Sequence, residues 1–152
     1  MDVLKFIMKE CGRKGGTTEK VMQKRMPVKE KVDADLNELG KEVEGTENGA
    51  PILYLFFKKG LFEAAEVCAD NCIIHLQAST VVNAIIGYIG VYFVFHVGYA
   101  PEHENFMYFL QYAFLGERKI PGSSVALNKF IHKFEKAIID YKESKGFKKL
   151  CV

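Results

Sequence analysis

The sequence lacks the short motifs by which many enzymes and secreted proteins are recognised. It has neither a GxxxxGK[ST] nor a GxGxxG pattern, no nucleophile elbow and no metalloprotease motif. It also has no N-x-S/T sequon, and charged residues near its start interrupt any signal peptide. We therefore expect a non-enzymatic protein with no catalytic residue, no cofactor and no metal site.

Cysteine is scarce as well. The four cysteines, at positions 11, 68, 72 and 151, are too few and too scattered for a disulfide framework. Cys151 is the second residue from the end, so a C-a-a-X prenylation signal is absent. We expect reduced thiols and an intracellular location, cytoplasmic or nuclear.

One cluster has the residue types of a metal site, namely Cys68-x3-Cys72-x2-His75, with His96 or His103 available as a fourth ligand. Zinc takes four tetrahedral ligands, usually from paired knuckles, and the sequence offers no second pair. Because a free cysteine commonly behaves as a small buried hydrophobic residue, we interpret these cysteines as structural.

The net charge of +2 is small, but the charges are unevenly distributed. Residues 1–31 carry a net charge of +5, residues 32–51 carry −5, residues 52–122 carry −2 and residues 123–152 carry +4. Acidic and basic segments can neutralise one another across solvated faces. Charge alone therefore does not indicate a nucleic-acid partner.

The longest uncharged run, residues 71–101, contains the most apolar stretch of the chain at residues 79–100. Its length suits a membrane span, but Asn83 and His96 are costly in hydrocarbon and no lysine or arginine closely flanks the stretch. Its β-branched residues favour a strand, whereas its length favours a helix. We predict a central helix buried on all sides, which Ser79 or Thr80 caps and Gly98 ends.

Short apolar runs separated by turns precede this helix. Residues 52–57, 62–68 and 72–77 predict a small antiparallel meander. Two helices are expected after residue 100. One begins at Pro101 and ends at Gly116, and the other is capped by Ser123 or Ser124 and ends at Gly146. The apolar residues of the last helix recur at helical spacing: Leu127, Phe130, Ile131, Phe134, Ala137, Ile138 and Tyr141.

The N-terminal region is predicted to contain helices at residues 1–11 and 17–26, followed by an acidic linker. Backbone N–H groups of the GRKGG turn between these helices can hold a phosphate, but no strand precedes the turn, so we interpret it as a plain loop. The basic residues Arg13, Lys14, Lys24 and Arg25 are candidate nucleic-acid contacts. The final Leu-Cys-Val of the chain is a possible ligand for a carboxylate-binding groove.

The segments VMQKRMPVKEKVDADL at residues 21–36 and VYFVFHVGYAPEHENFMYFLQ at residues 91–111 carry a resemblance. Together with the meander between them, they are similar to the C-terminal region of uncharacterised, transposon-associated animal proteins, some described as sterile alpha motif domain-containing. The matching positions are mostly apolar, so the resemblance concerns fold rather than activity. It implies a piece of a once longer protein and supplies no catalytic residue.

We therefore expect an α+β fold in which a small antiparallel meander packs against a buried central helix and flanking helices. Residues 1–50 form a helical and charged segment with an acidic linker, residues 51–146 form the core domain, and residues 147–152 form a basic tail. The expected function is a protein interaction or assembly module with a protein partner or self-association. The resemblance adds the expectation that the module derives from a mobile element. The alternatives are a nucleic-acid-binding accessory domain and a single-pass membrane protein spanning at residues 79–100.

Overall fold

The computed structural model describes residues 27–33, 50–69, 72–118 and 124–144, and these residues form an α+β fold. Their sheet has four strands in the order β1 (Val28–Val32), β2 (Ile52–Lys58), β3 (Leu61–Ala69) and β4 (Cys72–Leu76). Strands β2, β3 and β4 are antiparallel neighbours, which confirms the predicted meander. Strand β1 runs parallel to β2, so the sheet as a whole is mixed.

Strand β1 is absent from the sequence-based prediction, which places residues 1–50 outside the core domain. The structure pairs this strand with β2, from Val28 opposite Leu53 onward. After β1 ends, the Asp33 N–H donates to the Phe57 carbonyl (2.8 Å) and the Asp33 carboxylate accepts from the Lys59 N–H (3.0 Å). The predicted boundary between the N-terminal segment (residues 1–50) and the core domain (residues 51–146) therefore separates two strands that pair with each other. Predictions for residues 1–26, 34–49 and 145–152 lie outside the described residues.

The two faces of the sheet contain different sets of side chains because successive residues of a strand alternate sides. Leu53, Leu55 and Val67 belong to the main core, in which the sheet packs against the helices. The second face carries a smaller buried cluster: Ile52, Tyr54, Phe56 and Cys68. A strand that is apolar on both faces explains the nearly continuous hydrophobic run of β2.

Helix α4 (Val81–Val94) lies on the main-core face of the sheet. As predicted, Thr80 is its N-cap, since its hydroxyl accepts a hydrogen bond from the Asn83 N–H (3.2 Å). Two expectations are wrong. The helix stops at Val94 rather than at Gly98, and it is not buried on all sides, because Phe93 and Val94 are exposed.

The helix within residues 79–100 is also shorter than the membrane-spanning alternative requires. Fourteen residues of α-helix are about 21 Å long, whereas the hydrocarbon core is about 30 Å thick. Within the part of the chain that the structure describes, none of the helices combines the length and the apolar character that crossing a bilayer requires.

Helix α5 (Glu104–Leu110) begins three residues later than predicted, because residues 101–103 form a turn. It continues into one turn of π-helix, η2 (Gln111–Leu115), and Gly116 ends this segment in the left-handed conformation, as predicted. Helix α6 (Val125–Ser144) follows, and the Ser124 hydroxyl caps it by accepting from the Leu127 N–H (3.1 Å).

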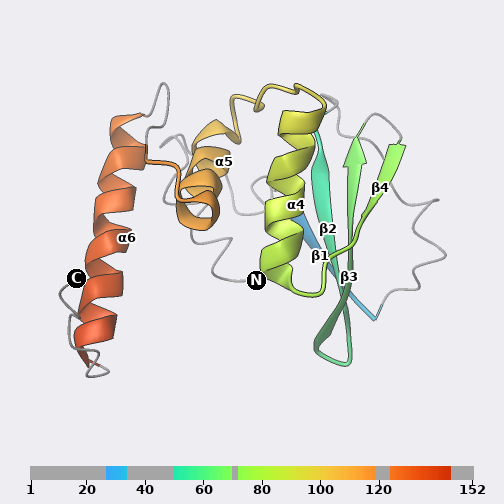
Figure 1. Ribbon diagram of the computed structural model, residues 1–152, viewed down its shortest axis with the longest axis horizontal. Coiled ribbons are helices and arrows are strands. Elements are labelled where there is room, and N and C mark those ends of the chain that lie inside the picture. The colour runs from blue at the N-terminus through green and yellow to red at the C-terminus, as the bar shows by residue number, and fades with distance from the viewer. Residues whose placement is uncertain (1–26, 34–49, 70–71, 119–123, 145–152) are drawn as a thin grey trace.

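The helical elements form successive layers beside the sheet. In Figure 1 the sheet, α4, α5 and α6 follow one another from right to left. Helix α4 contacts both the strands and the α5–η2 segment, while α6 contacts α5. The C-terminal end of α4 therefore lies between the sheet and the α5 layer, where the chain passes from one layer to the next.

Candidate functional site

The residues that the sequence singles out fall into two groups. The candidate nucleic-acid contacts Arg13, Lys14, Lys24 and Arg25 lie outside the described residues, so their role stays a prediction. The structure describes the cysteines and histidines of the possible metal cluster. Residues 70–71, between the two cysteines, lie outside the described residues.

The strand register separates the members of that cluster. Cys68 lies opposite Ile73 and Cys72 lies opposite Ala69, so the two thiols point to opposite faces of the sheet. Cys68 is buried and Cys72 is exposed. His75 lies beside Glu66, with 2.6 Å between the imidazole Nδ1 and the carboxylate oxygen. Among the described residues, no group of three or more histidine, cysteine or acidic side chains is arranged to hold a metal ion.

A pocket of about 470 Å³ opens where α4 ends. Its walls come from three parts of the chain, namely the last turn of α4, the loop that follows it, and the α5–η2 segment. Half of the lining residues are aromatic: the lining consists of Tyr92, Phe93, Val97, Gly98, Tyr99, Tyr108, Gln111 and Glu117. A concave site with aromatic walls and a few polar groups has the features of a binding site.

Three of the lining tyrosines belong to a ladder of rings packed edge to face. The ring centroids of Tyr88 and Tyr92 are 5.4 Å apart, those of Tyr92 and Tyr99 are 4.8 Å apart, and those of Tyr99 and Tyr108 are 5.4 Å apart. Neighbouring ring planes meet at 66° to 81°. Because each ring is wedged against the next, the pocket walls are held in a fixed arrangement.

The buried end of the ladder is anchored to the sheet. The Tyr88 hydroxyl donates to the Pro51 carbonyl (2.7 Å), just before β2, and lies 3.1 Å from the Tyr92 hydroxyl. The Tyr92 hydroxyl also lies within hydrogen-bonding distance of the Pro51 carbonyl (3.4 Å). These bonds satisfy polar groups that are costly to bury alone, and they fix α4 to the start of β2.

Burial keeps the tyrosine hydroxyls of the ladder protonated. It raises the pKa of Tyr88 well above its ordinary value, and it raises the pKa of Tyr99 to about 12. The pKa of Tyr108 is raised by burial first and by the negative charge of Glu104 second. These hydroxyls therefore remain hydrogen-bonding groups, not bases, well into the alkaline range.

The helix ends beside the pocket in a Schellman motif. His96 adopts the left-handed conformation (φ 52°), its N–H donates to the Phe93 carbonyl (3.4 Å), and the Val97 N–H donates to the Tyr92 carbonyl (3.0 Å). This turn brings Val97 back to line the pocket with Tyr92. The sequence-based prediction placed this end of the helix at Gly98 instead.

Four large apolar side chains around this turn are exposed, and we call them the apolar rim: Phe93, Val94, Phe95 and Val97. The exposed fraction is 72% for Val94 and 60% for Phe95. Phe93 and Val97 also line the pocket, so rim and pocket are continuous. A contiguous exposed apolar patch next to a cavity is typical of an interaction site.

The electrostatic character of the pocket is acidic. Among the residues that the structure describes, Glu117 is the charged member of the lining, and Glu104 lies close enough to Tyr108 to raise its pKa.

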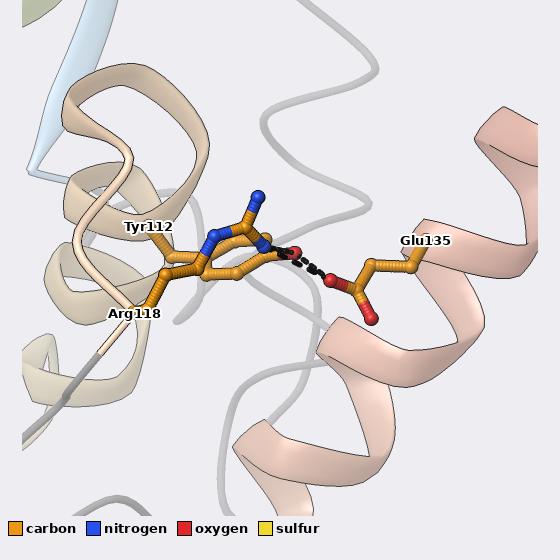
Figure 2. Close-up of polar contacts among 3 residues, drawn as sticks. All are labelled: Tyr112, Arg118 and Glu135. Atoms are coloured by element: carbon orange, nitrogen blue, oxygen red, sulfur yellow. Dashed lines mark hydrogen bonds and ion pairs between the residues drawn. The ribbon is translucent and has the colours of Figure 1, made fainter. Parts of the chain in front are cut away.

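Arg118 extends over the Tyr112 ring, with 4.9 Å between the guanidinium carbon and the ring centroid. Its Nη1 donates to the Glu135 carboxylate (3.0 Å) and to the Tyr112 hydroxyl (2.8 Å), which itself donates to Glu135. Figure 2 shows the three side chains converging between the end of η2 and α6. This contact fixes α6 to the segment that lines the pocket.

The sequence contains only part of the signal for this site. Tyr88 and Tyr92 are four residues apart, which places them on one face of a helix. Tyr99 and Tyr108 come from a loop and from another helix, so only the tertiary fold brings them to Tyr92. Sequence reasoning missed the apolar rim because it predicted that α4 is buried on all sides.

Comparisons of the chain with protein-family models, curated proteins and solved structures find no match. The resemblance of residues 21–36 and 91–111 to transposon-associated proteins therefore stays a prediction. The functional argument rests on the geometry of the pocket and its rim.

Proposed function

We propose that the chain is a non-enzymatic protein-interaction module, and that the pocket with its apolar rim binds a segment of another protein. The observation that carries this proposal is the continuity of an aromatic pocket of about 470 Å³ with exposed apolar side chains. Aromatic residues are enriched in protein interfaces, and binding energy concentrates in pockets that are desolvated on binding. An origin in a mobile element and an intracellular location stay predictions.

The chemistry of the pocket selects the partner. Tyrosine rings attract cations to their faces, and Glu117 is the charged residue among the described residues that line the pocket. We therefore expect the bound segment to insert a lysine or arginine side chain into the pocket. Its neighbouring residues are expected to be apolar, because they would cover Phe93 and Phe95 of the rim.

This charge pattern disfavours nucleic acid as the occupant of this pocket. A nucleic-acid groove combines stacking aromatic residues with lysine and arginine that contact phosphates. Here the aromatic residues are accompanied by Glu117, and the nearest arginine, Arg118, is paired with Glu135. A nucleic-acid function would rest on the basic N-terminal residues, and it stays the alternative prediction.

The experiment is selection of random twelve-residue peptides on the immobilised full-length chain. We expect enriched peptides to contain a lysine or arginine beside apolar residues. Binding of a selected peptide to the free chain is then measured by fluorescence polarisation. Phe95→Ser is expected to weaken binding about tenfold, the loss typical of a hot-spot residue. Glu117→Gln is expected to weaken it about threefold, and less at high salt.

The matched control is Leu61→Ser. Leu61 is also an exposed large apolar residue, but it follows the β2–β3 turn, at the other end of the sheet from the end of α4 (Figure 1). Its replacement should leave the affinity unchanged. The proposal is overturned if selection yields no common motif, if the motif is acidic, or if Leu61→Ser and Phe95→Ser weaken binding equally.

A further inference from the structure

The aromatic half of the pocket lining consists of rings that stand at steep angles to one another. Tyr92 and Phe93 come from the last turn of α4, Tyr99 comes from the loop after it, and Tyr108 comes from α5. The ring planes of Tyr92 and Tyr99 meet at 66°, and those of Tyr99 and Tyr108 meet at 81°. A cavity bounded by rings in this arrangement resembles the aromatic cages that bind quaternary ammonium groups.

Two tyrosine hydroxyls of these walls already have hydrogen-bond partners within the protein. The Tyr92 hydroxyl lies 3.1 Å from the Tyr88 hydroxyl and 3.4 Å from the Pro51 carbonyl oxygen. The Tyr108 hydroxyl donates to the Glu104 carboxylate, and burial first and this carboxylate second raise the pKa of Tyr108. The aromatic walls therefore offer a bound group ring surface more than hydrogen-bond acceptors.

The other polar side chains of the described lining lie together at the π-helical segment. Gln111 begins η2 and Glu117 follows its end, and the Glu117 N–H donates to the Gln111 carbonyl (3.4 Å). Glu117 is the charged member of the described lining. One side of the pocket is therefore polar and acidic, whereas the side formed by α4, the loop and α5 is aromatic.

This lining distinguishes between the cations that a protein partner supplies. A lysine ammonium has three N–H donors and an arginine guanidinium has five, and each donor that is buried without an acceptor costs free energy. Methylation of lysine replaces N–H donors by methyl groups and keeps the positive charge. The methyl groups suit aromatic walls, and the charge suits ring faces and a carboxylate. A methylated lysine is therefore more complementary to this lining than an unmodified one.

We propose that the side chain which the partner segment inserts into the pocket is a methylated lysine. The proposal rests on the proposed function, because it specifies the residue of the bound segment that occupies the pocket. The methylated ammonium group lies among Tyr92, Tyr99 and Tyr108. The methylene stem passes Phe93 and Val97, which belong to both pocket and rim and so stand at the entrance. A volume of about 470 Å³ is sufficient for this group.

The probe is the lysine-containing peptide that binds best among those selected on the immobilised chain. It is resynthesised with lysine, dimethyllysine or trimethyllysine at the same position, and its binding to the free full-length chain is measured by fluorescence polarisation. We expect methylation to tighten binding about tenfold. A fourth peptide carries a neutral analogue of trimethyllysine, in which carbon replaces the nitrogen. Because this analogue has the same shape without the charge, it should bind about tenfold more weakly than trimethyllysine.

Phe93 provides a variant that removes a ring and keeps an apolar side chain. Because Phe93 is 57% exposed, Phe93→Leu is expected to leave the fold intact, which circular dichroism melting checks. It should weaken binding of the trimethyllysine peptide about fivefold and that of the neutral analogue by a smaller factor, since leucine has no ring face. The matched control Tyr141→Leu removes an exposed ring from the last turn of α6, outside the pocket lining, and should leave both affinities unchanged.

Choline tests whether the ligand is a protein segment or a small quaternary ammonium compound. It carries a trimethylammonium group but has no neighbouring residues to cover the apolar rim. Choline chloride should therefore displace the trimethyllysine peptide only at concentrations about a hundredfold above the dissociation constant of the peptide. Sodium chloride at the same concentration is the control for screening of charges.

The inference fails alone, with the proposed function intact, if neither methylated peptide binds more tightly than the unmodified one. It also fails alone if the neutral analogue matches trimethyllysine, if Phe93→Leu weakens both equally, or if the selected peptides contain arginine and never lysine. Choline binding as tight as that of the peptide would assign the pocket to small molecules and contradict both proposals. If no selected peptide binds the free chain, the proposed function fails and this inference fails with it.

Discussion

The middle of α4 and its last turn are similar in composition and differ in environment. The middle places Ala84, Ile85 and Tyr88 in the main core against the sheet, whereas the last turn exposes Phe93 and Val94. Neither part contains a charged residue. An apolar run thus serves two purposes, since one portion stabilises the fold and the other remains available at the surface.

The difference arises from where the helix stops. The Schellman turn at His96 returns Val97 toward Tyr92 and directs the chain to α5. Tyr92 lines the pocket, Val94 and Phe95 belong to the rim alone, and Phe93 and Val97 belong to both. A longer helix, continuing to Gly98 as predicted, would not make this turn at His96.

The largest expected effect comes from truncating one β-branched residue in each part. Ile89 is fully buried and Val94 is 72% exposed. Ile89→Ala is expected to lower the free energy of unfolding by about 2 to 5 kcal/mol. The variant loses the favourable transfer of the deleted side-chain atoms from water into the core, and it leaves a cavity there. Val94→Ala should change it by less than about 0.5 kcal/mol. Urea denaturation followed by circular dichroism measures both.

The comparison fails if the two truncations cost the same. Equal losses would mean that Val94 is covered in solution, for example in a dimer formed through the rim. Repeating the measurement at two protein concentrations identifies that case, because an associating protein gains stability with concentration.

The two caps of α4 provide the next largest effect, with opposite signs. Thr80→Ala should lower the free energy of unfolding by about 1 kcal/mol, because the Asn83 N–H loses its acceptor. His96→Gly should raise it by up to about 1 kcal/mol, since glycine adopts the left-handed conformation without steric cost. Thermal melting of the two variants beside wild type measures the difference. A loss of stability in His96→Gly would show that the imidazole itself makes a stabilising contact.

Most of the fold was predictable because its signals are local. The alternation and turns of residues 52–77 give three strands, and the Lys59–Gly60 turn has the positive φ angles of a tight two-residue hairpin. Helical periodicity and a serine cap give α6. In each case neighbouring residues determine the element.

The parts that were not predicted depend on contacts distant in the sequence. Strand β1 has the sequence VKEKV, with three charges in five residues, and is stabilised by pairing with β2. His96 ends α4 although Gly98 is the better left-handed residue, and the hydrogen bond from the Val97 N–H to the Tyr92 carbonyl closes the turn there. The pocket joins residues of α4, a loop and α5, so only the tertiary fold reveals it.

The effect that is absent at neutral pH concerns Tyr99, which lies between the buried Tyr88 and the half-buried Tyr108 of the ladder. Burial raises its pKa from 10.0 to about 12, so folding disfavours the tyrosinate form. The neutral state is common to the folded and unfolded chain below pH 10, and the contribution of Tyr99 is fully present there. Above pH 10 the unfolded chain releases the proton first, so this contribution is lost as the pH rises toward 12.

Comparison with Tyr99→Phe isolates this titration from the ionisation of lysines and other tyrosines. The difference in free energy of unfolding between wild type and variant should be constant from pH 7 to about pH 9 and should then shift against the wild type toward pH 12. Urea denaturation at each pH measures it, and tyrosinate absorbance of the folded protein should show one late-titrating tyrosine fewer in the variant. A difference that stays constant through pH 12 would mean that water reaches the Tyr99 hydroxyl freely. The pocket wall would then be looser than the edge-to-face packing of Tyr92, Tyr99 and Tyr108 requires.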